Sequence, residues 1–280
     1  MNYNNKVGKI SVFGATGFVG QNFVYRFPEE SLVIPRKNLT SETPNILYFV
    51  GTNHNYNIFA NPKLDISVNL EHLIDVLESS RRAHGNLNIT YISTWFVYGN
   101  SPLPYQEHQS CRPRGFYSIT KYAAEMLLES YCQTYDLNFK IIRLGNVFGS
   151  GDKNASEKKN ALQYLVQKIR TNEDVQLYEN GEVQRDFIHN DDVARGIDLI
   201  LRRGRESEIY NLGSGYPTLL GPLLKEYAQR IGSKSKFIEI STPNFHKIVQ
   251  VRNAYLDTSK VSSLGFQIKK PISAQALEEV

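Results

Sequence analysis

The sequence predicts an α/β fold with a doubly wound parallel sheet, followed by a smaller C-terminal region. Three observations support this prediction. Short apolar runs with strand character alternate with helical stretches over the first half of the chain, a glycine-rich turn directly follows the first run, and the alternation ends near Gly149. Strands that alternate with helices form right-handed βαβ units, which give a parallel sheet covered by helices on both faces.

The first region contains short strands, separated by helices where apolar residues recur at helical spacing. Strands are predicted over residues 9–13, 32–34, 46–50, 88–93 and 139–144. Helices are predicted over residues 21–27, 69–82 and 118–134. The connection between the second and third strands is short. We therefore expect one strand that is usual in such sheets to be missing or abbreviated.

The pattern changes after Gly149. Residues 150–160 are polar and rich in glycine and lysine, which is typical of a surface loop. Further helices are predicted over residues 161–170, 191–202 and 219–231, and short strands over residues 175–177, 187–188, 208–210 and 237–240. We predict one domain over residues 1–149, and a smaller substrate-binding domain over residues 150–280 that is partly interleaved with the first.

Composition excludes several classes of protein. Of 280 residues, 41% are hydrophobic, which excludes a mainly disordered chain. Lys and Arg number 32 against 28 for Asp and Glu, an excess too small to favour nucleic-acid binding. No apolar run approaches the roughly 18 residues that span a bilayer, and residues 1–9 lack the apolar core of a secretory signal. With only two cysteines, we expect a cytoplasmic protein without membrane or nucleic-acid partners.

The glycine-rich turn carries the sharpest local signal. Residues 14–20 read GATGFVG, between the first strand and the first helix. Glycines permit a tight turn and close approach of a pyrophosphate, and the helix N-terminus supplies amide donors. The spacing is Gly-x-x-Gly-x-x-Gly instead of the dehydrogenase Gly-x-Gly-x-x-Gly. It predicts a Rossmann-type dinucleotide site formed by Gly14, Thr16, Gly17, Phe18, Val19 and Gly20.

The end of the second strand bears on the choice of cofactor. An acidic residue there would hold the ribose diol of NAD, but this chain has Pro35, Arg36 and Lys37. Cations suit the 2′-phosphate of NADP, so Arg36 favours NADP over NAD. The alternative is a solvated basic turn, and NAD therefore stays open.

A tyrosine and a lysine lie four residues apart, on one face of a predicted helix. They are Tyr117 and Lys121. A phenol has an ordinary pKa near ~10, which a neighbouring ammonium and an oxidised nicotinamide would lower toward neutrality. Upstream, the strand that ends in residues 92–94 brings hydroxyl groups to the ligand edge of the sheet. These features predict proton transfer; the alternatives are surface amphipathicity for the pair and turn capping for the hydroxyls.

With these motifs, the sequence resembles the extended short-chain dehydrogenases/reductases that process nucleotide sugars, the epimerase/dehydratase group. The resemblance covers about residues 9–266. Besides GATGFVG it rests on STWFVYG at Ser93, YSITK at Tyr117, RLGNVFG at Arg143, QRDFIHNDDVARG at Gln184, YNLGSG at Tyr210 and DTSKVSSLGF at Asp257.

The resemblance implies a role for several residues. Thr94, Tyr117 and Lys121 would be catalytic, and Tyr117 and Lys121 would also contact the cofactor. The substrate would be a nucleotide-diphosphate sugar. Its diphosphate would be gripped by Asn146 and Arg185, with Asn160 near the base or phosphate and Arg252, or less favourably Lys247, as a second clamp. The resemblance also implies a homodimer, for which the helix that carries Tyr117 is a candidate interface.

Two features narrow the chemistry. Dehydratases of this group carry an Asp-Glu pair directly after the catalytic Thr, where this chain has Trp95 and Phe96. Dehydration is therefore disfavoured. The six histidines make no grouping with metal-ligand spacing, so no metal site is expected.

These observations predict an NAD(P)-dependent nucleotide-sugar oxidoreductase that acts at the sugar C4 position. Arg36 favours 4-ketoreduction with NADPH, and NAD-dependent 4-epimerisation is the alternative because it uses the same residues. Two further possibilities are a non-catalytic NAD(P)-binding sensor or scaffold, and a reductase of a non-nucleotide carbonyl compound.

Overall fold

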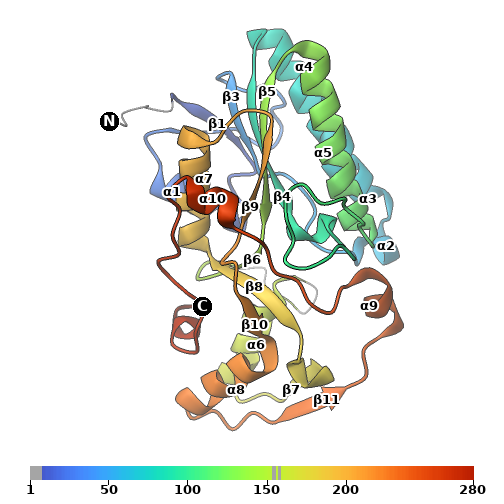
Figure 1. Cartoon of the computed structure of the whole chain (residues 1–280), viewed down its shortest axis with the longest axis vertical. Coiled ribbons are helices and arrows are strands. Elements are labelled where there is room, and N and C mark those ends of the chain that lie inside the picture. Colours follow the sequence, from blue (N-terminus) through green and yellow to red (C-terminus); the bar gives the residue numbers. More distant parts are fainter. Residues whose placement is uncertain (1–7, 153–155, 157–158) are drawn as a thin grey trace.

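The computed structural model describes residues 8–152, 156 and 159–280. The N-terminal segment before residue 8 and part of the predicted loop over residues 150–160 therefore lie outside the described residues. The centre of the fold is a six-stranded parallel sheet (Figure 1). Its strands, in spatial order, are β2 (Ser31–Val33), β1 (Ile10–Phe13), β3 (Asn45–Tyr48), β4 (Asn88–Thr94), β5 (Asn138–Leu144) and β9 (Glu208–Leu212).

The connection from β2 to β3 contains no helix and no further strand. A Rossmann sheet usually has one more strand beyond the strand that occupies the place of β2. Here the chain returns at once, and the Ser11 hydroxyl of β1 accepts hydrogen bonds from the backbone amides of Glu42 (2.9 Å) and Thr43 (3.0 Å). The expectation of a missing strand is confirmed, and β2 is an edge strand.

Helices cover both faces of the sheet, as predicted for a doubly wound fold (Figure 1). On one face, α4 (His72–His84) and α5 (Phe116–Tyr135) bury Leu73, Leu77 and Leu128 against the strands. On the other face lie α1 (Phe18–Arg26) and α7 (Asn190–Arg203). These two apolar layers fix α1 and α5 relative to the strand ends.

The segment before α4 differs from its prediction. The sequence predicts one helix over residues 69–82, whereas the structure has α2 (Asn57–Ala60), α3 (Lys63–Ile66) and a π-helical turn (Ser67–Glu71) leading into α4. The wider turn accompanies a buried Asn69, whose amide donates to the hydroxyls of Thr52 and Thr120 (both 2.9 Å). A local apolar period does not reveal such side-chain bonding between distant segments.

Most of the remaining elements form a second layer at the carboxyl ends of the central strands, in the lower part of Figure 1, whereas α10 packs against β9 beside α7. Short-range patterns do not predict strands β6 and β10 or the short helices α9 and α10. The strands are β6 (Asn146–Phe148), β7 (Val175–Tyr178), β8 (Gln184–His189), β10 (Pro217–Leu219) and β11 (Phe237–Ile240). The helices are α6 (Ala161–Arg170), α8 (Leu220–Arg230), α9 (Asn244–Val249) and α10 (Ser259–Ser263).

The two regions share elements across Gly149. Strand β9 pairs with β5 in the central sheet, and α7 packs beside α1, although both follow residue 149 in the chain. The domain boundary at that residue stays a prediction. Within the described part of the chain, no helix combines the length and apolar character needed to cross a membrane.

Candidate active site

A cavity of about 810 Å³ lies between the sheet and the second layer. It is lined by the glycine turn at α1, the carboxyl end of β4, the first turns of α5, and parts of α6, β7 and β8. In open α/β sheets, ligands bind outside the carboxyl ends of the strands, so this cavity is in the expected place. Its volume is that of a small-molecule or cofactor site.

The glycine turn forms one end of the cavity. Gly14 has φ +79°, and a Cβ atom at Gly20 would lie 2.5 Å from the carbonyl oxygen of Gly14, so both positions require glycine. Gly17 precedes α1, whose first turn has no side-chain cap and no acidic residue. Uncapped amides at a helix N-terminus suit a pyrophosphate, so these residues fit a dinucleotide. Thr16, predicted to bind cofactor, is exposed and lies outside the cavity wall.

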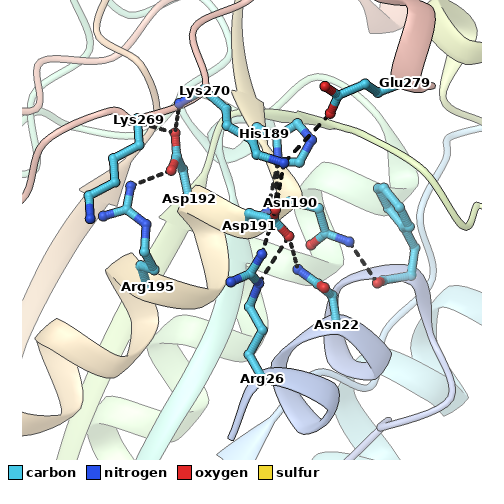
Figure 2. A network of polar contacts seen from close by, with 11 residues as sticks. Asn22, Arg26, His189, Asn190, Asp191, Asp192, Arg195, Lys269, Lys270 and Glu279 are labelled. Atoms are coloured by element: carbon cyan, nitrogen blue, oxygen red, sulfur yellow. Dashed lines mark hydrogen bonds and ion pairs between the residues drawn. The ribbon is translucent and has the colours of Figure 1, made fainter. Parts of the chain in front are cut away.

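A polar network holds helix α1, which follows the glycine turn, in place (Figure 2). The amide of Asn190, at the start of α7, donates to the backbone carbonyl of Phe18 (3.0 Å). Asp191 forms ion pairs with Arg26 (2.5 Å) and Lys270 (2.9 Å), which hold the pKa of its carboxyl well below the usual range. Helix α1, helix α7 and the C-terminal segment are thus tied together behind the turn.

Arg36 does not contact the cavity. It lies beyond β2 with an exposed side chain and is absent from the cavity wall. The expected cofactor contact, and the preference for NADP that it carried, therefore gain no support from the geometry.

Tyr117 and Thr94 meet at the middle of the cavity. Thr94 ends β4 and Tyr117 lies in the first turn of α5; both are buried, and their side chains are hydrogen-bonded. Burial raises the pKa of Tyr117 to about 12, and the Thr94 hydrogen bond opposes this. Without a bound nicotinamide, desolvation of the phenolate has the largest effect on this pKa. The expected lowering by an ammonium and an oxidised nicotinamide together stays a prediction.

Lys121 lies one turn further along α5, and it is also buried. Its ammonium donates to the carbonyl of Ile92 (2.8 Å) and lies 4.1 Å from the centroid of the Tyr91 ring. Burial lowers the pKa of Lys121 from 10.5 to about 7, with Glu125 acting in the opposite direction. A lysine with a pKa in this range gains or loses its proton near neutral pH.

A buried ion pair lies behind these residues. Arg143 of β5 and Glu125 of α5 are 2.6 Å apart, and each side chain is 3% exposed. The hydroxyl of Ser93, next to Thr94, also donates to Glu125. The pair joins the helix that carries Tyr117 and Lys121 to the two strands beneath it.

Trp95 and Phe96 form an aromatic wall beside Tyr117. Their ring centroids are 4.0 Å apart, and Phe96 lies edge-on to Tyr117 at 5.7 Å. The Arg185 guanidinium lies 5.7 Å from the centroid of the Trp95 ring. No carboxylate follows Thr94 here, so the wall is apolar next to the proposed proton donor and acceptor.

Three residues predicted to bind the substrate lie together at the far end of the cavity. Asn146 donates to the carbonyl of Asp186 (3.1 Å), and Asn160 donates to the Asp152 carboxylate (3.1 Å). Arg185 donates to three backbone carbonyls, among them that of Val251 (3.1 Å), and burial lowers its pKa to about 10. These contacts orient the side chains along the cavity wall.

Arg252 and Lys247 both line the cavity, so the choice between them stays open. The Arg252 side chain is 60% exposed and pairs with Glu179 (2.7 Å). The backbone carbonyl of Lys247 accepts a hydrogen bond from Arg114 (2.7 Å), and its side chain is exposed.

The cavity wall is strongly basic in the described part of the chain. Its two carboxylates, Asp152 and Glu179, are paired with Lys159 and Arg252. The basic side chains on the wall are Arg114, Lys121, Lys159, Lys168, Arg185, Lys247 and Arg252. Such a cavity favours an anionic ligand.

Comparison with known families decides the classification. The model of the NAD dependent epimerase/dehydratase family matches residues 36–213, which is more than half of the chain. The chain belongs to this family. The match begins after the glycine turn. The geometry of that turn is therefore an observation independent of the family match.

Curated relatives of this epimerase/dehydratase have varied activities. A Methanocaldococcus jannaschii protein provisionally named UDP-glucose 4-epimerase is 25% identical, with 92% of each chain covered. A dTDP-glucose 4,6-dehydratase of Streptomyces antibioticus is 28% identical over 64% of this chain, which spans about half (52%) of that relative.

Solved structures show the same fold. The Thermus thermophilus UDP-glucose 4-epimerase in complex with NAD has a TM-score of 0.85 at 22% identity, with 97% of each chain covered. RMD from Pseudomonas aeruginosa, complexed with NADPH, has a TM-score of 0.80 at 20% identity, over 98% of this chain and 97% of that one. The fold and family make the chain an enzyme of the short-chain dehydrogenase/reductase type.

Several residues on the cavity wall were not predicted from the sequence. Arg114, Lys159 and Lys168 add positive charge, and Asn55 lies beside Tyr117. Arg114 and Lys159 each lie close in sequence to a predicted site residue, which is a usable signal. Asn55 comes from the segment between β3 and α2, and nothing in its local sequence indicates that it reaches α5.

Proposed function

We propose that the protein is an NAD-dependent nucleotide-sugar 4-epimerase. The observation that carries the proposal is one continuous cavity. It joins the uncapped N-terminus of α1, the hydrogen-bonded pair Tyr117 and Thr94, and a basic far end. A dinucleotide fits the first of these, and a nucleoside diphosphate fits the last. The sugar would then lie between them, against Tyr117.

The chain supplies the proton chemistry. Tyr117 takes the proton from the C4 hydroxyl and later returns it, while the hydroxyl of Thr94 orients the same oxygen. The Lys121 ammonium, together with the positive charge of an oxidised nicotinamide, would favour the phenolate of Tyr117 against the effect of burial. The glycine turn and Lys121 would hold a nicotinamide cofactor, which would supply the hydride acceptor and donor for C4. Holding both reactants in this cavity supplies much of the acceleration.

The basic end binds the nucleotide. Arg185, held by backbone carbonyls, presents a planar fork of donors suited to phosphate oxygens. We assign Asn146, Asn160 and Arg252 to the same diphosphate and base. The positive wall also draws the anionic substrate toward the cavity.

The aromatic wall argues against dehydration. Elimination of water from the sugar needs an additional acid and base near the reacting carbons, and Trp95 and Phe96 offer neither. Two carboxylates of the described cavity wall, Asp152 and Glu179, are engaged with Lys159 and Arg252. Epimerisation at C4, in contrast, needs no acid or base besides Tyr117, which lines the cavity.

4-Ketoreduction is the second candidate, since it uses the same residues. Its support in the sequence was Arg36, which lies outside the cavity wall. The two reactions differ in the fate of the cofactor, because an epimerase regenerates it in each turnover. Purified protein should interconvert C4 epimers of a nucleotide hexose with NAD and without added NADPH. Strict dependence on stoichiometric NADPH would instead establish the reductase.

The remaining alternatives have their own tests. If Tyr117→Phe left every activity of the parent unchanged, a non-catalytic NAD(P)-binding sensor or scaffold would be the better description. If Arg185→Ala left the apparent Michaelis constant unchanged, a non-nucleotide carbonyl substrate would be favoured.

The homodimer stays a prediction. Helix α5 exposes apolar side chains, including Ile119 (48%) and Met126 (56%), on its outer face. Sedimentation of the parent and of Met126→Lys would test whether this face joins two copies.

A further inference from the structure

Arg114 lies between the two ends of the cavity, and no motif in the sequence assigns it a role. Its backbone precedes α5, and its N–H donates to the hydroxyl of Ser118 in the first turn of that helix (3.2 Å). Its side chain is half-buried and forms part of the cavity wall. The backbone of Arg114 is therefore fixed to the helix that carries Tyr117.

The guanidinium of Arg114 reaches α9, which belongs to the second layer. It donates to the backbone carbonyls of Lys247 (2.7 Å) and Gln250 (3.0 Å), and to the side-chain oxygen of Asn100 (3.2 Å). Carbonyls in the last turn of a helix have no partner within the helix, and a basic side chain can satisfy them. Arg114 thus caps the C-terminus of α9 from a different layer of the fold.

Helix α9 depends on outside contacts for its position. It has only six residues, and a helix of that length is not stable by itself in water. The ring of Phe245, near its start, contacts the rings of Tyr56 (centroids 5.2 Å apart) and of Phe59 in α2 (4.7 Å). These aromatic contacts hold the start of α9, and Arg114 holds its end.

The chain that leaves α9 holds Arg185 in place. The carbonyls of Val251 and Arg252 accept hydrogen bonds from the Arg185 guanidinium (3.1 and 2.6 Å). Residues 244–252, here called the α9 segment, also carry Lys247 and Arg252, the two candidates for a second phosphate clamp. A shift of the α9 segment would therefore displace Arg185 and both candidates together.

We propose that Arg114 is a positioning residue, which fixes the α9 segment to the helix that carries Tyr117 and so sets the Arg185 guanidinium for a nucleoside diphosphate. The inference rests on the proposed function, and it adds the residue that links the proposed substrate end to the proposed catalytic end. The sugar must fit between the phosphate-binding fork and the phenol, so a fixed separation of the two favours a productive geometry.

A double-mutant cycle tests whether Arg114 acts through Arg185. The probe is whichever of UDP, dTDP, GDP or CDP the NAD-loaded parent binds most tightly in calorimetry. Arg114→Met should raise the Kd of this probe about 10-fold, because the support of the Arg185 guanidinium is lost. In the Arg185→Ala background the same substitution should raise the Kd about 2-fold or less, since residues that act as a unit are not additive.

Two further variants separate position from charge. Arg114→Lys keeps the positive charge, but an ammonium lacks the planar fork that reaches two carbonyls at once, so the Kd should still rise at least about 3-fold. Arg112→Met is the charge-matched control, because Arg112 is exposed in the same segment and lies outside the cavity wall. It should bind the probe as the parent does.

The affinity for NAD provides the control for folding. The glycine turn lies at the other end of the cavity, so Arg114→Met should bind NAD within about 2-fold of the parent. If the affinity for NAD fell by the same factor as the affinity for the probe, the substitution would have loosened the whole fold, and the inference would be wrong.

The outcomes separate the two proposals. Suppose that the parent binds a nucleoside diphosphate. If Arg114→Met then raises its Kd less than about 5-fold, or by factors that differ less than about 2-fold between the two backgrounds, the inference is wrong and the proposed function stands. Full affinity in Arg114→Lys, or an equal loss in Arg112→Met, would also overturn it, because charge alone would then explain the effect. If the parent binds none of the four probes, the proposed function fails and the inference fails with it.

Discussion

The two ends of the cavity are built in different ways. At the proposed catalytic end, Thr94, Tyr117 and Lys121 are all buried on β4 and α5, which belong to the central layers. At the proposed substrate end, Arg252 is 60% exposed, and Asn160 has a left-handed backbone (φ 55°) just before α6. Asn146 and Arg185 of the substrate end still lie on strands β6 and β8. We therefore expect the chemistry to depend on a rigid scaffold, and substrate preference to depend most on the loop residues Asn160 and Arg252.

Tyr117→Phe should produce the largest effect on activity. Removing the hydroxyl abolishes proton transfer at C4, and general acid–base catalysis contributes about 10²–10⁴-fold. We expect kcat to fall at least about 1,000-fold in a C4 epimerisation assay, with unchanged affinity for the nucleoside diphosphate. A loss below about 10-fold would mean that the catalytic end has been misassigned.

Lys121→Met should lower kcat by about 100-fold and yet stabilise the fold. The pKa of Lys121 is lower in the folded protein (about 7) than in the unfolded chain, so the unfolded chain holds the proton more tightly. The resulting destabilisation is complete below about pH 7 and fades as pH rises toward 10.5. Urea unfolding at pH 6 should therefore show a gain on the order of 3 kcal/mol for the variant.

The pH dependence provides the control for that result. The stability gain of Lys121→Met should shrink as unfolding is repeated at pH 8 and pH 9.5. A gain that is the same at each pH would show that packing, and not the buried charge, causes it.

Arg185→Ala should affect binding more than chemistry. Its loss removes a guanidinium at the phosphate end, so the KM for the nucleotide sugar should rise about 10–100-fold while kcat changes little. The variant should also melt at a lower temperature, because three backbone carbonyls lose their donor. Thermal shifts with added nucleoside diphosphate should be reduced in parallel. A fall in kcat with KM unchanged would place Arg185 at the catalytic end instead.

Arg252→Ala should have the smallest effect. The side chain is mostly exposed and paired with Glu179, and exposed ion pairs are worth about 0–1 kcal/mol. We expect less than about a 5-fold rise in KM. A rise as large as that of Arg185→Ala would show that the exposed Arg252 contributes as much to substrate binding as Arg185, which backbone carbonyls hold in place.

The sequence predicted the layers of the fold, because these depend on local patterns. The strand–helix alternation and the spacing of Tyr117 and Lys121 are local, and the structure places both side chains on the cavity wall. The π-helical turn over Ser67–Glu71 depends instead on Asn69 bonding to Thr52 and Thr120, which no apolar period reveals.

The contact of Arg36 with the cofactor stays a prediction. Its side chain is exposed after β2 and is not part of the cavity wall, so the geometry adds no support to it. The pKa of Tyr117 in the protein without ligands depends on burial by segments far away in sequence, which the local spacing does not reveal. Asn55 reaches α5 from another segment, and only the folded chain brings the two together.

The fate of the C4 hydrogen tests the central claim most directly. The purified protein would be given NAD and a nucleotide hexose deuterated at C4, without added NADPH, and the C4 epimer would be examined by NMR. The account predicts that the epimer forms and keeps deuterium at C4, because the hydride leaves and returns within one turnover. An epimer with hydrogen at C4, or no epimer until NADPH is supplied, would contradict it.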